Sequence, residues 1–256
     1  MHTAPPFLHP HTLHSHVTAF STLRSGGVSK GQYASFNICH YTGDNPADVE
    51  ANRSLLATHL GIPATHIILP RQTHSTEVRL IDAPPQDDEL QGVDALITQT
   101  PRLCIGVSTA DCIPILLYDP VHRTLAAIHA GWRGTVGKIV RRTIGQMQAH
   151  CRTRPTDLIA TIGPGISREA YEVGEELPRL FEEAGFPLPH IAEKRNGSWH
   201  LDLPAANRIE LLRCGLPENQ ITHSRLCTHT HNDRFFSARR QGIHSGRIYT
   251  ALMLRA

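Results

Sequence analysis

The sequence predicts a mixed α/β fold in which largely antiparallel sheets are flanked by helices. Short apolar runs follow one another through tight turns, which indicates neighbouring strands, while the helical segments are few and separate. The regular strand–helix alternation of a parallel doubly wound sheet is missing. Hydrophobic residues make up 40% of the 256 residues and charged residues 19%, which is enough apolar material for a packed core. With no internal repeat or linker, we expect one domain over residues 17–256.

The first part of the chain is expected to contain a tail, a strand and a helix. Residues 1–16 are rich in His and Pro, which predicts a flexible tail. A strand follows at 17–23 and leads into a turn of Ser, Gly and Gly. A helix then begins after Asn45, a suitable N-cap, with Pro46 in its first turn and Gly61 closing its end.

The rest of the chain alternates apolar runs with turns and carries two more helices. Six apolar runs in the middle of the chain predict strands at 67–69, 78–81, 95–98, 103–107, 113–118 and 125–129. Apolar residues at helical spacing then predict one amphipathic helix through Val136, Ile139, Val140, Ile144 and Met147. Towards the C-terminus we expect a strand at 158–162, a helix at 204–213, and strands around Cys227, Phe235-Phe236 and 248–254.

Charge and cysteine content exclude several classes of protein. The net charge is +2 with both signs interspersed, so a nucleic-acid or anionic-membrane partner is not expected. The apolar runs are too short to span a bilayer and the start of the chain lacks a secretory signal, so we expect a cytoplasmic protein. The six Cys form no CxxC pair, which indicates reduced thiols, of which one or two could be ligands or nucleophiles.

One segment in the middle of the chain carries residues suited to chemistry. Asp119-Pro120 indicates a turn between two apolar strands, and therefore a β-hairpin. A turn centred between Pro120 and Val121 places Cys112 directly opposite His129, with Cβ atoms about 5 Å apart on one face of the sheet. A thiolate and an imidazole at that spacing can share a metal ion or a proton. A bulge in either strand would change this register.

Three interpretations of the pair remain open. Cys112 and His129 could be an ordinary buried thiol beside a hydrogen-bonded imidazole, because free Cys is often a small core residue. They could be a nucleophile and its base, as in cysteine hydrolases and deamidases. They could also be two ligands of a metal site, for which His74 is a candidate third ligand. Gly131 and Gly134 are expected to let the backbone pass close to such a site.

Several segments, in order along the chain, resemble one known family. They cover nearly the whole chain from residue 20 onwards: FSTLRSGGVSKGQYASFN (20–37), GDNPADVEANR (43–53), RQTH (71–74), VDALIT (93–98), TADCIPILLYDP (109–120), AAIHAGWRGT (126–135), IGPGISREAYEVGEE (162–176), LDL (201–203) and the CT, RFFSARR and GR runs of 227–247. TADC followed by HAGWRG at this separation is highly specific. On these residues the chain resembles the YfiH-type laccase-domain family, which includes the peptidoglycan editing factor and enzymes described as purine nucleoside phosphorylases.

The resemblance implies a fold and a metal. The fold would be a single domain, a mixed β-sandwich flanked by helices in four αββα layers, similar to toxin deamidases. The family's His, Cys and His map onto His74, Cys112 and His129, which would hold one Zn²⁺ and leave a fourth position open for water or substrate. Copper is less favoured and laccase activity is not expected, because the HCH motif of multicopper oxidases is missing and only three Met could serve as axial ligands.

The resemblance also implies an activity, namely phosphorolysis of adenosine, inosine and methylthioadenosine, with deamination of adenosine as a second reaction. Purine nucleoside and phosphate would then be the partners, and we favour a monomer. Phosphorolysis needs an anion site beside the ribose, for which arginine is well suited. The candidate substrate- and phosphate-binding residues are Arg24, Asn37, Arg53, Asp111, Arg133, Cys227 and Arg239.

Several of these candidates have a second interpretation. Each arginine could instead belong to a structural ion pair. Asp111 could orient a metal-bound imidazole or cap a turn, and Cys227 could line the cleft or fill the core. Three further histidines could form a second, weaker metal site or simply lie on the surface: His229, His231 and His244.

Two other functions stay open. The chain could be a metal-independent hydrolase acting on peptidoglycan precursors, with Cys112 as nucleophile and His129 as base. It could also be a non-catalytic protein that binds such a precursor. The sequence departs from the family pattern at 72–75, where Gln-Val-His-Gly is usual, and at 237–241, where a SYRRD-type run is usual. The second departure removes a Tyr and an Asp, so no substrate role can be carried over for them.

Overall fold

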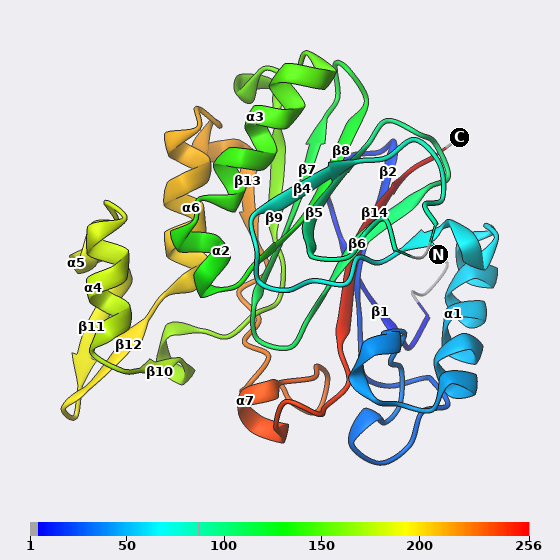
Figure 1. The fold of residues 1–256 in the computed structure, drawn as a ribbon, viewed down its shortest axis with the longest axis horizontal. Helices are drawn as coiled ribbons and strands as arrows, with labels where there is room; N and C mark the ends of the chain where they lie inside the picture. The colour runs from blue at the N-terminus through cyan, green and yellow to red at the C-terminus, as the bar shows by residue number, and fades with distance from the viewer. Residues whose placement is uncertain (1–4, 87, 256) are drawn as a thin grey trace.

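The structure is a computed structural model that describes residues 5–86 and 88–255. These residues form a mixed α/β fold with three sheets and several helices (Figure 1). The five-stranded sheet has the order β1 (Leu8–His11), β2 (Val17–Thr22), β14 (Ile248–Leu254), β6 (Cys104–Thr109) and β3 (Ile67–Ile68). The six-stranded sheet has the order β13 (Ile221–His223), β9 (Ile159–Ile162), β7 (Ile113–Asp119), β8 (Thr124–Ala130), β5 (Val93–Thr98) and β4 (Glu77–Leu80). The smallest sheet has the order β10 (Glu172–Val173), β12 (Ser198–Leu201) and β11 (Ala192–Arg195).

Most strands pair in antiparallel fashion. Among the described strand pairs, only β3 with β6, β4 with β5 and β9 with β13 run parallel. The α-helices are α1 (Pro46–Leu60), α2 (Trp132–Val136), α3 (Ile139–Cys151), α4 (Glu176–Glu183), α5 (Leu188–Ile191), α6 (Leu203–Arg213) and α7 (Ala238–Gln241). The mixed, largely antiparallel arrangement predicted from the sequence is therefore confirmed.

The two large sheets pack face to face, and helices cover their other faces (Figure 1). Val107 of β6 and Leu116 of β7 meet in the core between these sheets. Leu56 of α1 belongs to the core on the other face of the five-stranded sheet. Ile144 of α3 packs with Ile115 on the other face of the six-stranded sheet. The four-layer description and the similarity to toxin deamidases stay predictions.

The first predicted helix has the expected ends, whereas the amphipathic helix in the middle of the chain does not. The side chain of Asn45 accepts a hydrogen bond from the backbone N–H of Ala47 at 2.9 Å, and Gly61 follows α1 with a φ of 66°. The single helix predicted for the middle of the chain is two helices, α2 and α3. They are separated because Lys138 adopts a left-handed φ of 63°.

Part of the predicted N-terminal tail is ordered in a sheet. The flexible tail predicted for residues 1–16 is wrong for residues 8–11, which form β1 and pair with β2. Pairing is favoured because Leu8 and Leu13 become buried. His11 also contacts the Ser21 hydroxyl through Nε2 at 2.8 Å. Residues 1–4 lie outside the described part of the chain.

Two of the strands predicted near the C-terminus are turns instead. Cys227 forms a single bridge with Gly165 rather than a strand. The backbone N–H of Phe235 donates to the carbonyl of His231 at 2.9 Å, which closes a turn. The predicted strand at Phe235-Phe236 is wrong because both rings are buried by this turn segment without sheet pairing. The last predicted strand, β14, is confirmed.

A buried carboxylate connects α6 to α3, and its loss should destabilise the fold. The side chain of Glu210 is only 1% exposed and lies 3.0 Å from Arg213, 3.2 Å from Lys138 and 3.4 Å from Arg141. Removing one partner of such a buried network leaves the remaining groups without compensation. We expect Glu210→Ala to lower the free energy of unfolding by about 2–3 kcal/mol, as measured by urea denaturation.

The matched control for this prediction is another glutamate that pairs with α6. Glu218 pairs with Arg208, but its side chain is 74% exposed. Exposed ion pairs contribute little, so Glu218→Ala should change the free energy of unfolding by less than about 0.5 kcal/mol. Equal losses in the two variants would contradict a special contribution from Glu210.

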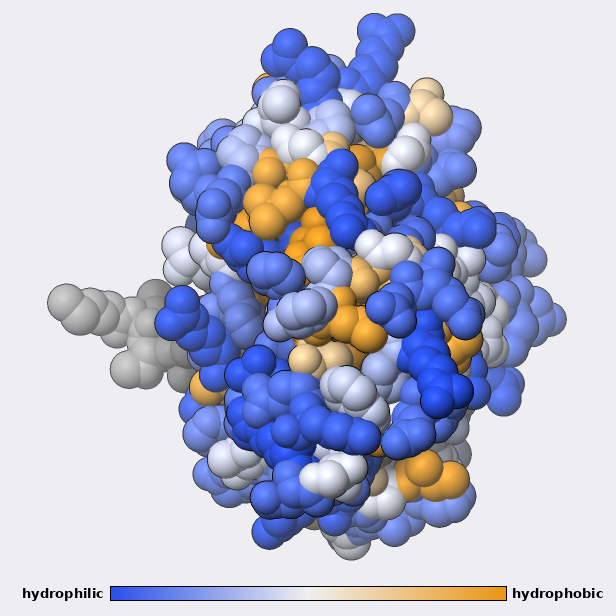
Figure 2. All heavy atoms as spheres, turned by 90° about the vertical axis from the view of Figure 1, so that its left-hand side faces the viewer, coloured by the Kyte–Doolittle hydropathy of each residue, from blue (hydrophilic) through white to orange (hydrophobic). Residues whose placement is uncertain are grey.

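The surface seen in Figure 2, on the side of α4 and α5, is mostly hydrophilic, with apolar side chains showing in separate places. Among the described residues, no helix combines the length and the apolar character needed to cross a membrane. The most exposed large apolar side chain in the described part of the chain is Ile243, at 73%. Ile243 also lines the cleft of the candidate site.

Candidate metal centre

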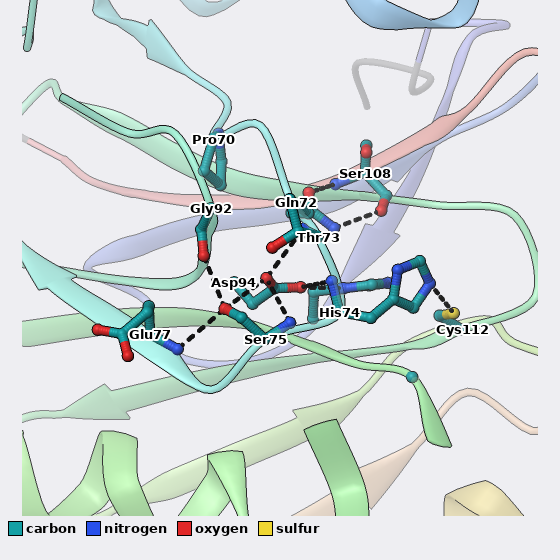
Figure 3. Close-up of polar contacts among 12 residues, drawn as sticks. Pro70, Gln72, Thr73, His74, Ser75, Glu77, Gly92, Asp94, Ser108 and Cys112 are labelled. Carbon is teal, nitrogen blue, oxygen red and sulfur yellow. Dashed lines mark hydrogen bonds and ion pairs between the residues drawn. The ribbon is translucent and has the colours of Figure 1, made fainter. Parts of the chain in front are cut away.

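Three side chains from separate segments meet at one end of the six-stranded sheet. His74 lies on the loop between β3 and β4, Cys112 directly precedes β7, and His129 lies in β8. Their potential ligand atoms all lie within 4.8 Å of one another, and His74 Nε2 is 3.7 Å from Cys112 Sγ (Figure 3). Within residues 5–86 and 88–255, this is the single group of three or more potential protein ligands of that kind.

The hairpin that carries Cys112 and His129 has a different register from the predicted one. His129 stands opposite Pro114, and the turn spans residues 120–123. The prediction is off by two residues along β7 because it assumes a shorter turn. Side chains alternate along a strand, so a shift of two positions keeps Cys112 on the same face as His129. The two side chains therefore meet although they are not directly paired.

The backbone approaches the cluster closely at Gly131. A Cβ atom added there would lie 2.8 Å from His74 Cδ2 and 3.1 Å from Cys112 Sγ. Such distances are shorter than ordinary contacts between carbon atoms. Glycine at this position therefore leaves the space that the imidazole and the thiol occupy. At Gly134 the nearest atoms to an added Cβ are 3.4 Å away, so that position is less restrictive.

A carboxylate that sequence reasoning missed connects two of the three side chains. Asp94 of β5 is fully buried, and its Oδ1 accepts a hydrogen bond from His129 Nδ1 at 2.7 Å. The same carboxylate accepts hydrogen bonds from the backbone N–H groups of residues 73–75, at 2.9–3.1 Å (Figure 3). The signal in the sequence is an Asp inside the otherwise apolar run of 93–98.

The loop that carries His74 is also fixed from its other side. The amide of Gln72 donates to the carbonyl of Ser108 at 2.8 Å and accepts from its N–H at 2.7 Å, as a paired strand would. The Tyr41 hydroxyl lies 2.6 Å from the Ser108 hydroxyl. His74 itself has a φ of 61°, a left-handed conformation that is uncommon for a residue other than glycine. The surrounding hydrogen bonds maintain this conformation.

The electrostatics of the cluster favour a thiolate. Burial alone would raise the pKa of the Cys112 thiol, but the charge of His129 and hydrogen bonds from both imidazoles lower it to about 6. Burial alone would lower the pKa of His129, but the Cys112 thiolate and the bond to Asp94 raise it to about 9. Near neutral pH the site therefore holds Cys112 in the form that binds metals and attacks electrophiles.

The cluster opens into a cleft of about 550 Å³, a size that suits a small organic ligand. Of the predicted substrate residues, Asp111 and Arg239 line it. Most of the other lining residues were not predicted, among them Tyr41, Tyr171, Ile243 and Arg247. A larger hollow of about 660 Å³ shares Tyr41 with this cleft but does not contain the cluster. The smaller cleft is the candidate site because it contains the potential metal ligands His74, Cys112 and His129.

The contacts of Asp111 agree with the second of its two interpretations, a residue that caps a turn. Its carboxylate accepts hydrogen bonds from the Thr228 hydroxyl at 2.6 Å and from the backbone N–H of Arg239 at 2.7 Å. Its φ is 95°, and its carbonyl accepts the N–H of Ile166 at 2.8 Å. Asp111 therefore joins three segments beside Cys112, whereas the carboxylate that accepts a hydrogen bond from an imidazole of the cluster is Asp94.

The side chain of Arg239 lies beside Tyr171 at the cleft. Its Nη1 donates to the backbone carbonyl of Glu172 at 2.9 Å, and its guanidinium lies 5.3 Å from the centre of the Tyr171 ring.

Arg239 is the one candidate arginine that lines the cleft, so Arg24, Arg53 and Arg133 lie outside it. Arg24 donates to the carbonyl of Asn232 at 2.6 Å. Arg53 donates to the carbonyl of Ile67 at 2.8 Å and borders the larger hollow. Within the described residues, no cluster of potential metal ligands includes the three C-terminal histidines considered for a second site, His229, His231 and His244.

The remaining candidates have contacts that explain them without a substrate. Asn37 is fully buried and donates to the carboxylate of Asp44 at 2.9 Å. The guanidinium of Arg133 stacks over the Trp132 ring at 4.2 Å and is not among the residues that line the cleft. Cys227 is buried, and its sulfur accepts a hydrogen bond from the backbone N–H of residue 167 at 3.3 Å. The structure therefore brings only part of the predicted set together.

Comparison with known proteins identifies the family of the chain. The sequence model of the family described as multi-copper polyphenol oxidoreductase laccase matches residues 18–255. The chain belongs to this family. The resemblance to YfiH-type laccase-domain proteins seen in the sequence is thereby confirmed. The family description names copper, and the metal that the cluster of this laccase-family chain could bind must be argued from its own donor atoms.

Two curated relatives of this laccase-family chain carry names of purine enzymes. The chain is 44% identical to a purine nucleoside phosphorylase of Bacteroides thetaiotaomicron, over 94% of this chain and 93% of the relative. It is 41% identical to adenosine deaminase RL5 of an unknown prokaryotic organism, over 92% and 93% of the two chains. These names support an enzymatic role for this chain.

Solved structures of the laccase family share the fold. The hypothetical protein YfiH of Bacillus licheniformis superposes with a TM-score of 0.88 at 29% identity, over 93% of each chain. YlmD of Geobacillus stearothermophilus gives the same TM-score at 31% identity, over 99% of this chain and 94% of that one. The mixed α/β architecture is thus the architecture of these relatives.

Proposed function

We propose that the chain is a zinc-dependent purine nucleoside phosphorylase that acts on adenosine and inosine. Methylthioadenosine phosphorolysis and adenosine deamination would be further activities of the same site. The observation that supports this most directly is the His74, Cys112 and His129 cluster, which opens into a cleft of nucleoside size. The names of the relatives add purine nucleoside and phosphate as substrates. The cytoplasmic location, the monomeric state and the single domain over 17–256 stay predictions.

The donor atoms of the cluster fit zinc. Two imidazoles and one thiolate are the three-ligand set of a catalytic zinc site, which keeps one position open. A blue-copper site uses the same three donors with an axial ligand such as Met. Met147 of α3 and Met253 of β14 are both buried in the hydrophobic core, and neither lines the cleft. The donor set therefore favours Zn²⁺ over copper.

The proposed reaction places separate demands on the residues of the cleft. A phosphate oxygen bonds to C1′ of the ribose while the bond from C1′ to the purine nitrogen breaks and its electrons move to the base. Bound Zn²⁺ would supply a Lewis acid at the end of the cleft. Arg239, whose side chain lies beside Tyr171, is the cation that we expect to hold phosphate. Ile166, Tyr171 and Ile243 offer an apolar wall for the base.

Phosphate-dependent cleavage of inosine tests this proposal. Wild-type protein with zinc should convert inosine and phosphate to hypoxanthine and ribose 1-phosphate in equal amounts. We expect Arg239→Gln to raise the KM for phosphate roughly tenfold or more, because one charge-assisted hydrogen bond is lost. Arg133→Gln removes an arginine outside the cleft and should leave this KM unchanged. Hypoxanthine release that does not depend on phosphate would refute the phosphorylase assignment.

The lowered pKa of Cys112 supports a second candidate function. A thiolate beside His129 is also the arrangement of a metal-independent hydrolase, which would act on peptidoglycan precursors. In that case alkylation of Cys112 would abolish turnover in protein that chelators have already freed of metal. In the zinc enzyme, chelation alone would abolish turnover before any alkylation.

A further inference from the structure

One buried carboxylate receives hydrogen bonds from both histidine-bearing segments of the cluster. Asp94 Oδ1 accepts from His129 Nδ1 at 2.7 Å and from the backbone N–H of His74 at 3.1 Å. Asp94 Oδ2 accepts from the N–H of Thr73 at 3.0 Å, and from the N–H and the hydroxyl of Ser75 at 2.9 Å and 2.8 Å. The side chain of Asp94 is fully buried, so these five donors replace water around it.

These contacts determine how the two imidazoles face the cluster. Ala95 pairs with Ile128 in the antiparallel β5–β8 ladder, so Asp94 stands opposite His129 one position further along. Because His129 uses Nδ1 to donate to Asp94, its Nε2 remains available as a ligand atom. The loop of residues 73–75 wraps its N–H groups around the same carboxylate, and this turn directs His74 Nε2 towards Cys112.

We propose that Asp94 is the positioning residue of the metal site, because one carboxylate sets the orientation of two of its three ligands. The inference rests on the proposed metal and does not depend on which nucleoside is turned over. The sequence suggested that Asp111 either orients an imidazole or caps a turn, and its carboxylate is occupied by the Thr228 hydroxyl and the backbone N–H of Arg239. Asp94 therefore performs the first of these two roles.

The chain contains a matched carboxylate that has no ligand to position. Asp119, at the opposite end of β7, is also fully buried and accepts from His122 Nδ1 at 2.9 Å. It also accepts the backbone N–H groups of Val121 at 2.8 Å and His122 at 3.1 Å. Asp119→Asn thus removes the same kind of buried charge and hydrogen bonds as Asp94→Asn, but away from the cluster.

The test compares zinc affinity in wild type, Asp94→Asn and Asp119→Asn. Zinc binding is measured by competition with a chromophoric chelator, and thermal unfolding of the metal-free proteins is recorded in parallel. Both variants should unfold at lower temperature. Only Asp94→Asn should bind zinc more weakly, by about 10–100-fold, and its cobalt-substituted form should show altered ligand-field bands. Unchanged zinc affinity in Asp94→Asn, or equal weakening in both variants, would overturn the positioning role.

Wild-type protein offers a test that does not depend on whether the variants fold. In ¹⁵N-histidine-labelled protein with zinc, we expect His129 to keep a proton on Nδ1 and to bind the metal through Nε2. Coordination through Nδ1 would overturn the role of Asp94 even if the cluster binds zinc. A wild-type protein that takes up no zinc would instead refute the proposed metal itself, so the two failures are distinguishable.

Discussion

Cys112→Ser should abolish zinc retention and lower kcat/KM for inosine by roughly a thousandfold or more. The Cys112 sulfur lies 3.7 Å from His74 Nε2, and its pKa of about 6 makes it the anionic ligand of the set. A serine hydroxyl stays protonated at neutral pH and cannot replace a thiolate. Metal content by mass spectrometry of tag-free protein, together with the phosphorolysis assay, measures both effects.

A second thiol in the chain provides the control for this variant. Cys227 also has a lowered pKa, because hydrogen bonds from the residue 167 and residue 230 segments outweigh the effect of burial. It is not among the residues that line the cleft. Cys227→Ser should keep about one zinc per chain and near-normal turnover. Full activity in Cys112→Ser would refute the metal proposal and the hydrolase alternative together.

The members of the cluster could be predicted because each stands in a short segment that resembles the YfiH-type family, whereas the residues alone suggested only the pair of Cys112 and His129 and left His74 as a candidate. The hairpin register was harder to predict because Asp119-Pro120 marks where a turn begins and not how many residues it contains. The error of two positions did not separate Cys112 from His129, since the side-chain period along a strand is two. An error of one position would have moved Cys112 to the opposite face.

The supporting residues could not be predicted because their partners are distant in the sequence. Asp94 lies 20 residues from His74 and 35 from His129, and only the fold shows that they meet. The arginines illustrate the same limit. Residue type alone makes Arg24 and Arg239 equal candidates for phosphate, but Arg239 lines the cleft whereas Arg24 does not and donates to the backbone carbonyl of Asn232. Only three-dimensional packing distinguishes them.

The space at Gly131 provides the second prediction with a large expected effect. We expect Gly131→Ala to weaken zinc binding by about 10–100-fold, because the added methyl group would lie 2.8 Å from the His74 ring and 3.1 Å from Cys112 Sγ. The backbone itself is not strained by the substitution, since Gly131 has a φ of −71° that any residue adopts. The exposed His74 imidazole can move aside, so the loss should fall on the metal site more than on the fold. Zinc competition and thermal unfolding measure the two effects separately.

Gly145→Ala is the matched control, because nothing lies within 4 Å of a Cβ added to that glycine in α3. Alanine suits a helix interior better than glycine, so this variant should gain about 0.5–1 kcal/mol of stability and keep its zinc affinity. If Gly131→Ala bound zinc as tightly as Gly145→Ala, the imidazole and the thiol would not need the close approach of the backbone. Weaker zinc binding with nearly unchanged thermal stability would show that the cluster depends on a side chain being absent at residue 131, as well as on its three ligands.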